Sequence, residues 1–170
     1  MWWNVPILEL FTISSSLEHP QISINKIHGK QLSFNNYNDI FTALSISKSL
    51  PKNIGTVIVK HANPCGVSAN KNNLKSFESA FNCDPLSAFG GIVSCNFKIN
   101  SKLASILNDT FFEVIISNGF DKNALKILKK KKNIRLIDAS NFILTENLKI
   151  NSYNDQLLFQ NEDKIQFKPQ

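Results

Sequence analysis

A lysine followed directly by a histidine is the pair in this sequence best suited to chemistry. Lys60 and His61 come after a β-branched run over residues 56–59, which predicts a buried strand. A neighbouring ammonium favours the neutral imidazole, which can then act as a base. More often, such a pair has no catalytic role and is a surface lysine beside a core histidine in a tight turn. Spacing alone leaves both interpretations open.

The elements that must position this pair alternate between strands and helices. We predict strands on either side of Gly29 within residues 22–34, and further strands over 56–59, 90–94, 112–116, 134–137 and 157–159. We predict helices from an Asn38–Asp39 cap to the residue before Pro51, and over 74–82, 101–107 and 121–130, with a polar loop around Pro64 and Gly66. This alternation predicts an α/β layered fold with a mixed, largely parallel sheet flanked by helices.

Open parallel sheets bind ligands outside the carboxyl ends of their strands. Three predicted strands carry suitable groups: the one ending at Lys60 and His61, the one entered through Gly90 and Gly91, and the one containing Glu113. We therefore expect these residues to approach one cleft.

Length and composition indicate one globular domain. The chain has 170 residues, of which 42% are hydrophobic and 19% charged. No apolar run reaches the roughly 20 residues of a membrane-spanning helix, and the N-terminus lacks the basic start of a signal peptide. Three separated cysteines fit a reducing cytoplasm. We expect a cytoplasmic protein with no membrane partner.

The net charge of +6 is weak evidence for a nucleic-acid partner. Arg135 is the only arginine, and lysines lack the bidentate geometry that favours phosphate and guanine recognition. Abundant Lys, Asn and Ile share A/T-rich codons, which explains the charge more simply. The run Lys129–Lys132 predicts the solvated end of a helix. We expect no nucleic-acid partner.

Five motifs follow one another along the chain: HGKQLSFNNYND, KHANPCGV, DPLSAFGGIV, FFEVIIS and KKNIRLI, with a weaker continuation through LLFQNED. In this order they resemble the formyltransferase domain of one enzyme family, the AICAR transformylase/IMP cyclohydrolases of purine biosynthesis (AICAR is aminoimidazole carboxamide ribonucleotide). The resemblance implies transfer of a formyl group from the cosubstrate 10-formyltetrahydrofolate to the 5-amino group of AICAR. It also implies a cytidine-deaminase-like fold.

The resemblance also implies roles for particular residues. The family's catalytic Lys–His pair matches Lys60 and His61, with His61 as base and Lys60 as the cation beside the developing negative charge. Gly90 matches a close approach of backbone to nucleotide. Glu113 and Asn36 match substrate-contacting positions. The resemblance further implies a homodimer that binds AICAR and folate.

Two departures from the family pattern limit which of the family's properties can be expected of this chain. The family's phosphate-contacting RYGENPHQ motif survives only as a vestige in residues 18–21, so we expect residues 1–20 to be irregular or wrongly assigned. Residues 21–170 correspond to the first half of the formyltransferase domain. We expect a fragment, inactive alone, that lacks the second half, its potassium site and the cyclohydrolase domain.

Two other functions remain open from sequence. A zinc deaminase needs H-x-E and P-C-x-x-C motifs, but Asn63 and Ser68 replace its glutamate and second cysteine, which leaves too few ligands, so we expect no metal site. The other alternative is a non-catalytic nucleotide-binding or dimerisation remnant.

Overall fold

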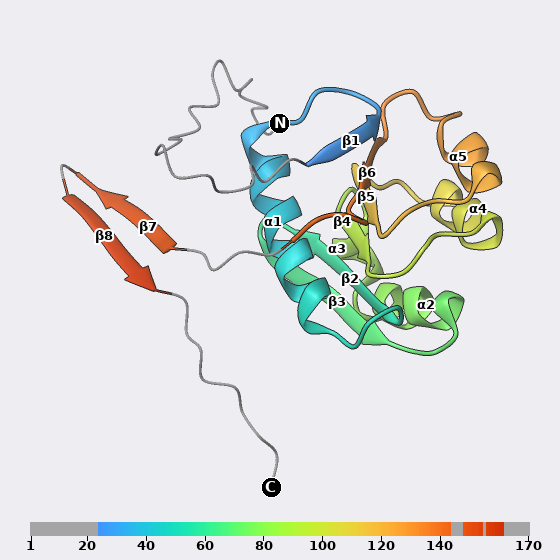
Figure 1. The fold of residues 1–170 in the computed structure, drawn as a ribbon, viewed down its shortest axis with the longest axis horizontal. Helices are drawn as coiled ribbons and strands as arrows, with labels where there is room; N and C mark the ends of the chain where they lie inside the picture. The colour runs from blue at the N-terminus through green and yellow to red at the C-terminus, as the bar shows by residue number, and fades with distance from the viewer. Residues whose placement is uncertain (1–23, 144–147, 155, 162–170) are drawn as a thin grey trace, which may run out of the picture.

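The computed structural model describes residues 24–143, 148–154 and 156–161, and structural statements below concern these residues. Its large sheet contains β1 (Asn25–His28), β2 (Gly55–Lys60), β3 (Asn63–Ala69), β4 (Ile92–Cys95), β5 (Val114–Ser117) and β6 (Arg135–Asp138) (Figure 1). The helices are α1 (Phe34–Ser49), α2 (Asn73–Cys83), α3 (Pro85–Ala88), α4 (Ser101–Asp109) and α5 (Lys122–Leu128). A separate hairpin pairs β7 (Leu148–Tyr153) with β8 (Gln156–Asn161), which confirms the predicted strand over 157–159.

The strand order of the large sheet is β1-β6-β5-β4-β2-β3. The central strands β4, β5 and β6 are parallel, whereas β2 runs antiparallel to β4, and β1 and β3 pair antiparallel at the two edges. The predicted α/β layered fold is confirmed, with the parallel part in the centre of a mixed sheet. The likeness to cytidine deaminases stays a prediction.

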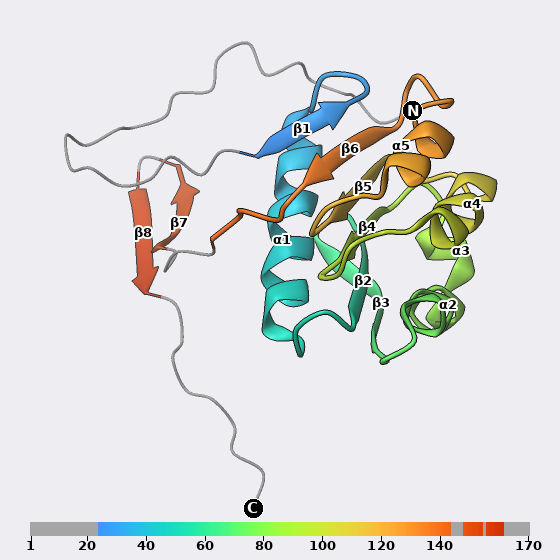
Figure 2. The ribbon, with the colours of Figure 1, turned by 45° about the vertical axis from the view of Figure 1, so that its right-hand side comes forward.

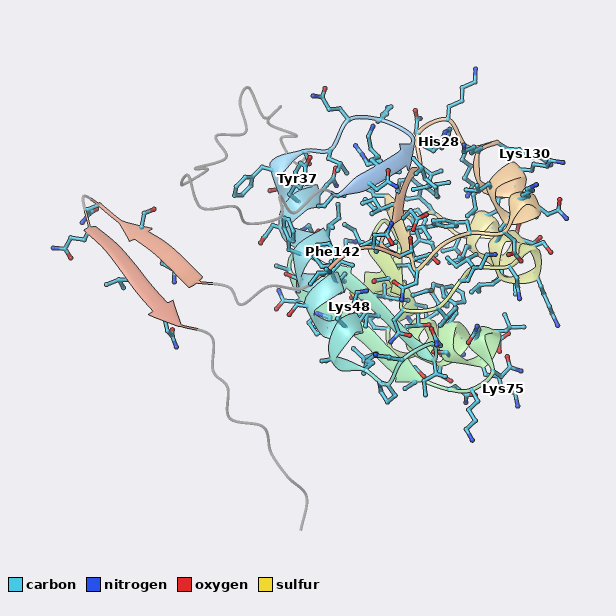
Figure 3. The ribbon with its side chains drawn as sticks, in the orientation of Figure 1. His28, Tyr37, Lys48, Lys75, Lys130 and Phe142 are labelled. Atoms are coloured by element: carbon cyan, nitrogen blue, oxygen red, sulfur yellow. The ribbon has the colours of Figure 1, made fainter. Side chains whose placement is uncertain are left out.

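Helices cover both faces of the sheet, as Figure 2 shows. Strand β5 illustrates why, because its consecutive buried residues point to opposite faces. Ile115 packs into the cluster formed with α2, α4 and α5, while Ile116 packs into the cluster formed with α1. Every residue of β4 and β5 is buried, as expected of parallel strands covered on both sides. Figure 3 shows Tyr37 and Lys48 on the α1 side of the molecule, away from Lys75 and Lys130.

The predicted second strand after Gly29 is wrong, and so is the predicted start of the first long helix. Ser33 is the N-cap of α1, which begins at Phe34 rather than near Asn38. The Ser33 hydroxyl accepts from the Asn36 amide, and the Asn36 side chain accepts from the Ser33 amide. This reciprocal capping box satisfies two backbone donors and starts the helix earlier than predicted.

The predicted polar loop after His61 is also wrong, since residues 63–69 form β3 and pair antiparallel with β2. Pro64 is tolerated because β3 is an edge strand, where a missing amide donor breaks no central ladder. Gly66 lets α2 approach closely, because a Cβ there would overlap the Ala80 carbonyl.

Smaller differences concern element ends. Asn100 rather than Ser101 caps α4, and α5 ends at Leu128, before the lysine run. The expectations for residues 1–20, and the motif vestige at 18–21, lie outside the described residues. No described helix is both long and apolar enough to cross a membrane.

Candidate active site

Two residues connect β2 to β3, and one of them is His61. His61 and Ala62 have φ values of 54° and 57°, the positive-φ pair of a type I′ hairpin turn. Such turns favour Asn-Gly, and each residue with a Cβ in this region costs roughly 1–2 kcal/mol. The Asp39 carboxylate of α1 accepts the Ala62 amide at 2.6 Å, and the Asn63 side chain donates to the His61 carbonyl at 2.8 Å. These bonds hold a strained turn in which the His61 side chain is exposed.

Lys60 is the last residue of β2 and points to the segment between α3 and β4. Its ammonium donates to the Phe89 carbonyl at 2.9 Å. Gly90 follows with φ 74°, a conformation that favours glycine, and its amide donates to the Phe111 carbonyl at 2.8 Å. The Phe89 and Phe111 rings, both exposed, lie 5.3 Å apart between centroids. Lys60 and Gly90 are therefore neighbours beside an aromatic pair.

Glu113 lies just before β5 and joins a second polar cluster. Its Oε2 accepts from the Asn36 side chain at 3.0 Å and lies 3.6 Å from Nη1 of Arg135. Asn36 is buried in the first turn of α1, where the capping box fixes its backbone. The Arg135 side chain is 11% exposed and also donates through Nε to the Gln31 carbonyl. Both of these contacts are at Oε2, and the described residues supply no donor to Oε1.

The two clusters share one edge of the sheet, but for a different reason from the predicted one. Gly90 and Glu113 precede their strands and lie at amino ends, not carboxyl ends. Strand β2 is antiparallel to β4, so Lys60 at its carboxyl end reaches the same edge: Val59 pairs with Ile92, and Ile92 with Val114. At about 4.8 Å per strand, the backbones of Lys60 and Glu113 are roughly 10 Å apart. The two clusters are therefore separated by a distance that a small-molecule ligand can span.

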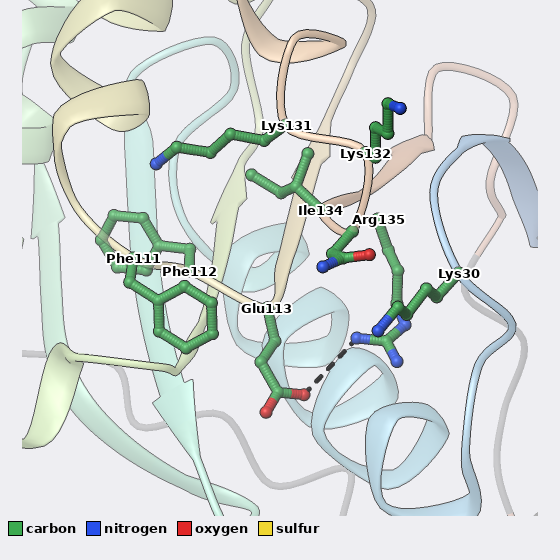
Figure 4. Close-up of a pocket in the computed structure, with 9 residues that line it drawn as sticks. Lys30, Phe111, Phe112, Glu113, Lys131, Lys132, Ile134 and Arg135 are labelled. Atoms are coloured by element: carbon green, nitrogen blue, oxygen red, sulfur yellow. Dashed lines mark ion pairs between the residues drawn. The ribbon is translucent and has the colours of Figure 1, made fainter.

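A pocket of about 460 Å³ opens on the β6 side of Glu113 (Figure 4). Its lining residues carry four cations, one carboxylate and two phenylalanines: Lys30, Phe111, Phe112, Glu113, Lys131, Lys132, Asn133, Ile134 and Arg135. Lys60, His61 and Gly90 are not among them. Of the sequence-predicted site residues, only Glu113 faces this pocket.

Three contributors to the site are missed by reasoning from the sequence. Asp39 is predicted as part of a helix cap, but it lies inside α1 and holds the amide after His61. Phe89 contributes a backbone carbonyl, which leaves no side-chain signal. Arg135 lies in the KKNIRLI motif and in a predicted strand, but the sequence argument gives it no role in the site, although a sole arginine in a predicted strand is a usable signal of an anion contact.

Cys65 and Cys95 do not add a nucleophile to this site. Burial, reinforced by the negative charge of Asp84, raises the pKa of the half-buried Cys65 thiol. Burial also raises the pKa of Cys95 to about 12. A raised pKa keeps each thiol protonated and weakly nucleophilic near neutral pH. Within the described ranges, no three His, Cys, Asp or Glu side chains gather in a way that could hold a metal ion.

The sequence matches the family described as AICARFT/IMPCHase bienzyme over residues 10–170. The chain belongs to this family. It is 38% identical over 156 residues to the bifunctional purine biosynthesis protein PurH of Bacillus cytotoxicus, and 39% identical over 156 residues to that of Bacillus cereus. Each match covers 91% of this chain and 30% of the relative. The resemblance found from the motifs is thereby confirmed, and the chain spans about 30% of the length of these relatives.

Proposed function

We propose that this chain supplies the lysine–histidine side of an AICAR formyltransferase site in de novo purine biosynthesis. The observation that carries the proposal is the strained β2–β3 turn, which presents His61 at the sheet edge where Lys60, Gly90 and Glu113 also lie. Unfavourable backbone conformations persist where the surroundings hold them, and they concentrate at functional sites. Here Asp39 and Asn63 hold the turn.

The proposed reaction transfers the formyl group of 10-formyltetrahydrofolate to the 5-amino group of AICAR. That amine is a poor nucleophile because its lone pair is delocalised into the ring and the carboxamide. His61 accepts a proton from the amine as the new C–N bond forms, and the Lys60 ammonium stabilises the developing oxyanion. The bond between the formyl carbon and N10 of the folate then breaks, and the proton taken up by His61 passes to that nitrogen, so that tetrahydrofolate leaves and His61 returns to its neutral form. Formyl-AICAR is the product.

In this proposal Glu113 contacts the substrate, and Asn36, which matches a substrate-contacting position of the family, acts through Glu113. Glu113 Oε1 is available to accept from ribose hydroxyls or amide donors, because the described contacts of the carboxylate are at Oε2. Asn36 contributes by orienting Glu113 from a buried position. Gly90 allows the nucleotide to approach the backbone. A homodimer in the cytoplasm, folate binding and a potassium ion held outside this chain belong to the same proposal.

Titration of the 170-residue chain with AICAR, followed through backbone amide shifts by NMR, tests the binding part of the proposal. We expect the largest shifts at the turn containing His61, at Gly90 and at Glu113. The Glu113→Gln variant should weaken binding roughly tenfold, since it removes a charged acceptor. The exposed Glu78→Gln substitution on α2 is the matched control and should leave affinity unchanged. Shifts confined to other surfaces would overturn the proposal.

A further inference from the structure

The pocket beside Glu113 carries more positive charge than its surroundings neutralise. Four of its lining side chains are cationic and one is a carboxylate. That carboxylate is already contacted by Asn36 and Arg135. Lys131 donates to the Thr110 carbonyl at 3.0 Å, which satisfies a donor but leaves its charge uncompensated. Positive charges gathered around a concave surface create a positive local potential, which attracts an anion.

Two of these cations converge. In Figure 4 the Lys30 and Arg135 side chains run to the same end of the pocket, next to Glu113, whereas Lys131 runs toward the phenylalanines and Lys132 away. Among the described residues, the Lys30 ammonium has no carboxylate or carbonyl partner. Arg135 uses Nε for the Gln31 carbonyl and Nη1 for Glu113, so Nη2 still offers its two donors.

The backbone around Lys30 is fixed, so the turn fixes the point from which the Lys30 side chain reaches the pocket. Lys26 donates from one ammonium to the carbonyls of Gly29 and Lys30, each at 3.0 Å. Gly29 has φ 93° and packs so closely on Ile134 that a Cβ would overlap the Ile134 carbonyl. His28 contacts the Lys131 carbonyl at 3.2 Å across the same junction. The turn before α1 and the turn before β6 therefore form one rigid pocket wall.

We propose that this pocket binds an oxyanion, a phosphate or carboxylate group, between Lys30 and Arg135. The guanidinium of Arg135 supplies a planar pair of donors, and Lys30 supplies a point charge beside it. The Glu113 carboxylate, which belongs to the lining of the same pocket, accepts a hydrogen bond from a hydroxyl or amino group of the same ligand. At about 460 Å³ the pocket has room for more than the anionic group alone. The proposal shares Glu113 with the site above, but it rests on charge and shape and not on formyl transfer.

Titration of the 170-residue chain with inorganic phosphate at constant, low ionic strength tests this proposal by NMR. We expect amide shifts at Lys30, at Glu113 and in the 131–135 turn. Lys30→Gln and Arg135→Gln should each weaken phosphate binding by roughly tenfold or more, because each removes a charge-assisted hydrogen bond. Lys75→Gln changes the net charge equally at the far end of the molecule from His28 (Figure 3), and should change affinity less than about twofold.

Ribose 5-phosphate and succinate identify the kind of anion. Tighter binding of ribose 5-phosphate than of phosphate, lost in Glu113→Gln, would support a phosphate site with a hydroxyl donor; equal binding of succinate would support a carboxylate site. If Arg135→Gln fails to fold, Arg135→Lys is used instead, because it keeps a cation at this position. Lys30 is exposed, so Lys30→Gln tests the proposal independently of Arg135. The proposal is overturned if phosphate leaves the pocket amides unshifted, or if Lys75→Gln weakens binding as much as Lys30→Gln. Neither result bears on His61, because no folate or formyl transfer is involved.

Discussion

Glu113 is the residue that links the two parts of the site. Its Oε2 is held by Asn36 from α1 and by Arg135 from β6, while its backbone amide donates to Gly91. Two partners on one oxygen fix the rotation of the carboxylate, so the other oxygen has a defined direction. A carboxylate held in one orientation accepts hydrogen bonds from ligand donors in one direction, so it is more selective than a freely rotating carboxylate.

Asn36→Asp tests how closely Asn36 and Glu113 are coupled. The substitution places a second carboxylate 3.0 Å from Glu113 Oε2, in a buried position. We expect the free energy of unfolding at pH 7 to fall by about 1–3 kcal/mol, since a hydrogen bond becomes a like-charge contact. Lowering the pH to about 4 should recover much of this loss as one carboxyl gains a proton. Asn38→Asp, on an exposed part of the same helix, is the control; equal losses in urea titrations would contradict the coupling.

The three cysteines should differ in reactivity by position. Cys83 is exposed, Cys65 is half-buried with a raised pKa, and Cys95 is buried with its pKa raised to about 12. At pH 8 the reactive thiolate fraction is smaller where the pKa is higher. Iodoacetamide should therefore modify Cys83 first, Cys65 more slowly and Cys95 only after unfolding. Mass spectrometry of timed samples measures the order, and early labelling of Cys95 in the folded protein would refute it.

The β2–β3 turn is the element on which the proposed chemistry depends. Its strain follows from two consecutive residues with positive φ and a Cβ atom, in a place where glycine or asparagine would fit better. The fold tolerates this unfavourable conformation because hydrogen bonds of Asp39 and Asn63 hold the turn from either side. This is the pattern expected where a side chain's position matters more than the stability of its turn.

Ala62→Gly should stabilise the protein, which is unusual for this substitution. Glycine relieves the positive φ at this position, with an expected gain of about 0.5–1 kcal/mol after its greater entropy in the unfolded chain is subtracted. Ala69→Gly, at an exposed position at the end of β3, should instead destabilise by about 0.5–1 kcal/mol. Urea unfolding of the two variants measures the difference. If Ala62→Gly loses stability as Ala69→Gly does, the turn is not strained.

At the scale of the whole molecule, one sheet separates two hydrophobic clusters. Leu44 of α1 is buried in one cluster, and Leu107 of α4 is buried in the other. The strands β4 and β5 contribute residues to both clusters, so neither face can lose its packing without affecting the other. The edge that carries Lys60 and Glu113 is therefore rigid only when both layers are formed.

Leu44→Ala and Leu107→Ala should each lower the free energy of unfolding by about 2–5 kcal/mol, the usual cost of truncating a buried leucine. Both variants should keep a single unfolding transition, because the shared sheet couples the layers. Far-UV circular dichroism and near-UV absorbance, recorded during the same denaturant titration, test this. Two separated transitions in either variant would show that the faces fold independently.

The sequence allows most of the central sheet to be predicted, because buried parallel strands are short β-branched runs with little ambiguity. Residues 114–117 and 135–138 are examples, each within two residues of its predicted place. It does not allow β3 to be predicted, since Pro64 and Gly66 usually indicate a loop, and only pairing with β2 makes the segment a strand. The direction of β2 relative to β4 is equally hidden, because strand direction is set by topology.

The candidate site is predictable to the extent that it lies in short motifs. Lys60, His61, Gly90 and Glu113 all stand in such motifs, and they lie along one edge of the sheet, but Gly90 and Glu113 lie at the amino ends of their strands and not at the predicted carboxyl ends. The partners of these residues are not predictable in the same way. Asp39 and Arg135 act through contacts between elements distant in sequence, and the Phe89 carbonyl has no side-chain signature.

The turnover of a His61→Ala variant, in a full-length protein that carries these residues, tests the central claim most directly. With AICAR and 10-formyltetrahydrofolate as substrates, we predict that kcat falls about a hundred- to ten-thousand-fold, as expected for loss of a general base. The KM for AICAR should change little, because proton removal develops in the transition state while ground-state contacts are spread over many groups. Glu78→Ala, at an exposed position on α2 outside the proposed site, should leave kcat nearly unchanged. A His61→Ala enzyme with near-normal kcat, or one impaired only in KM, would contradict the role assigned to His61.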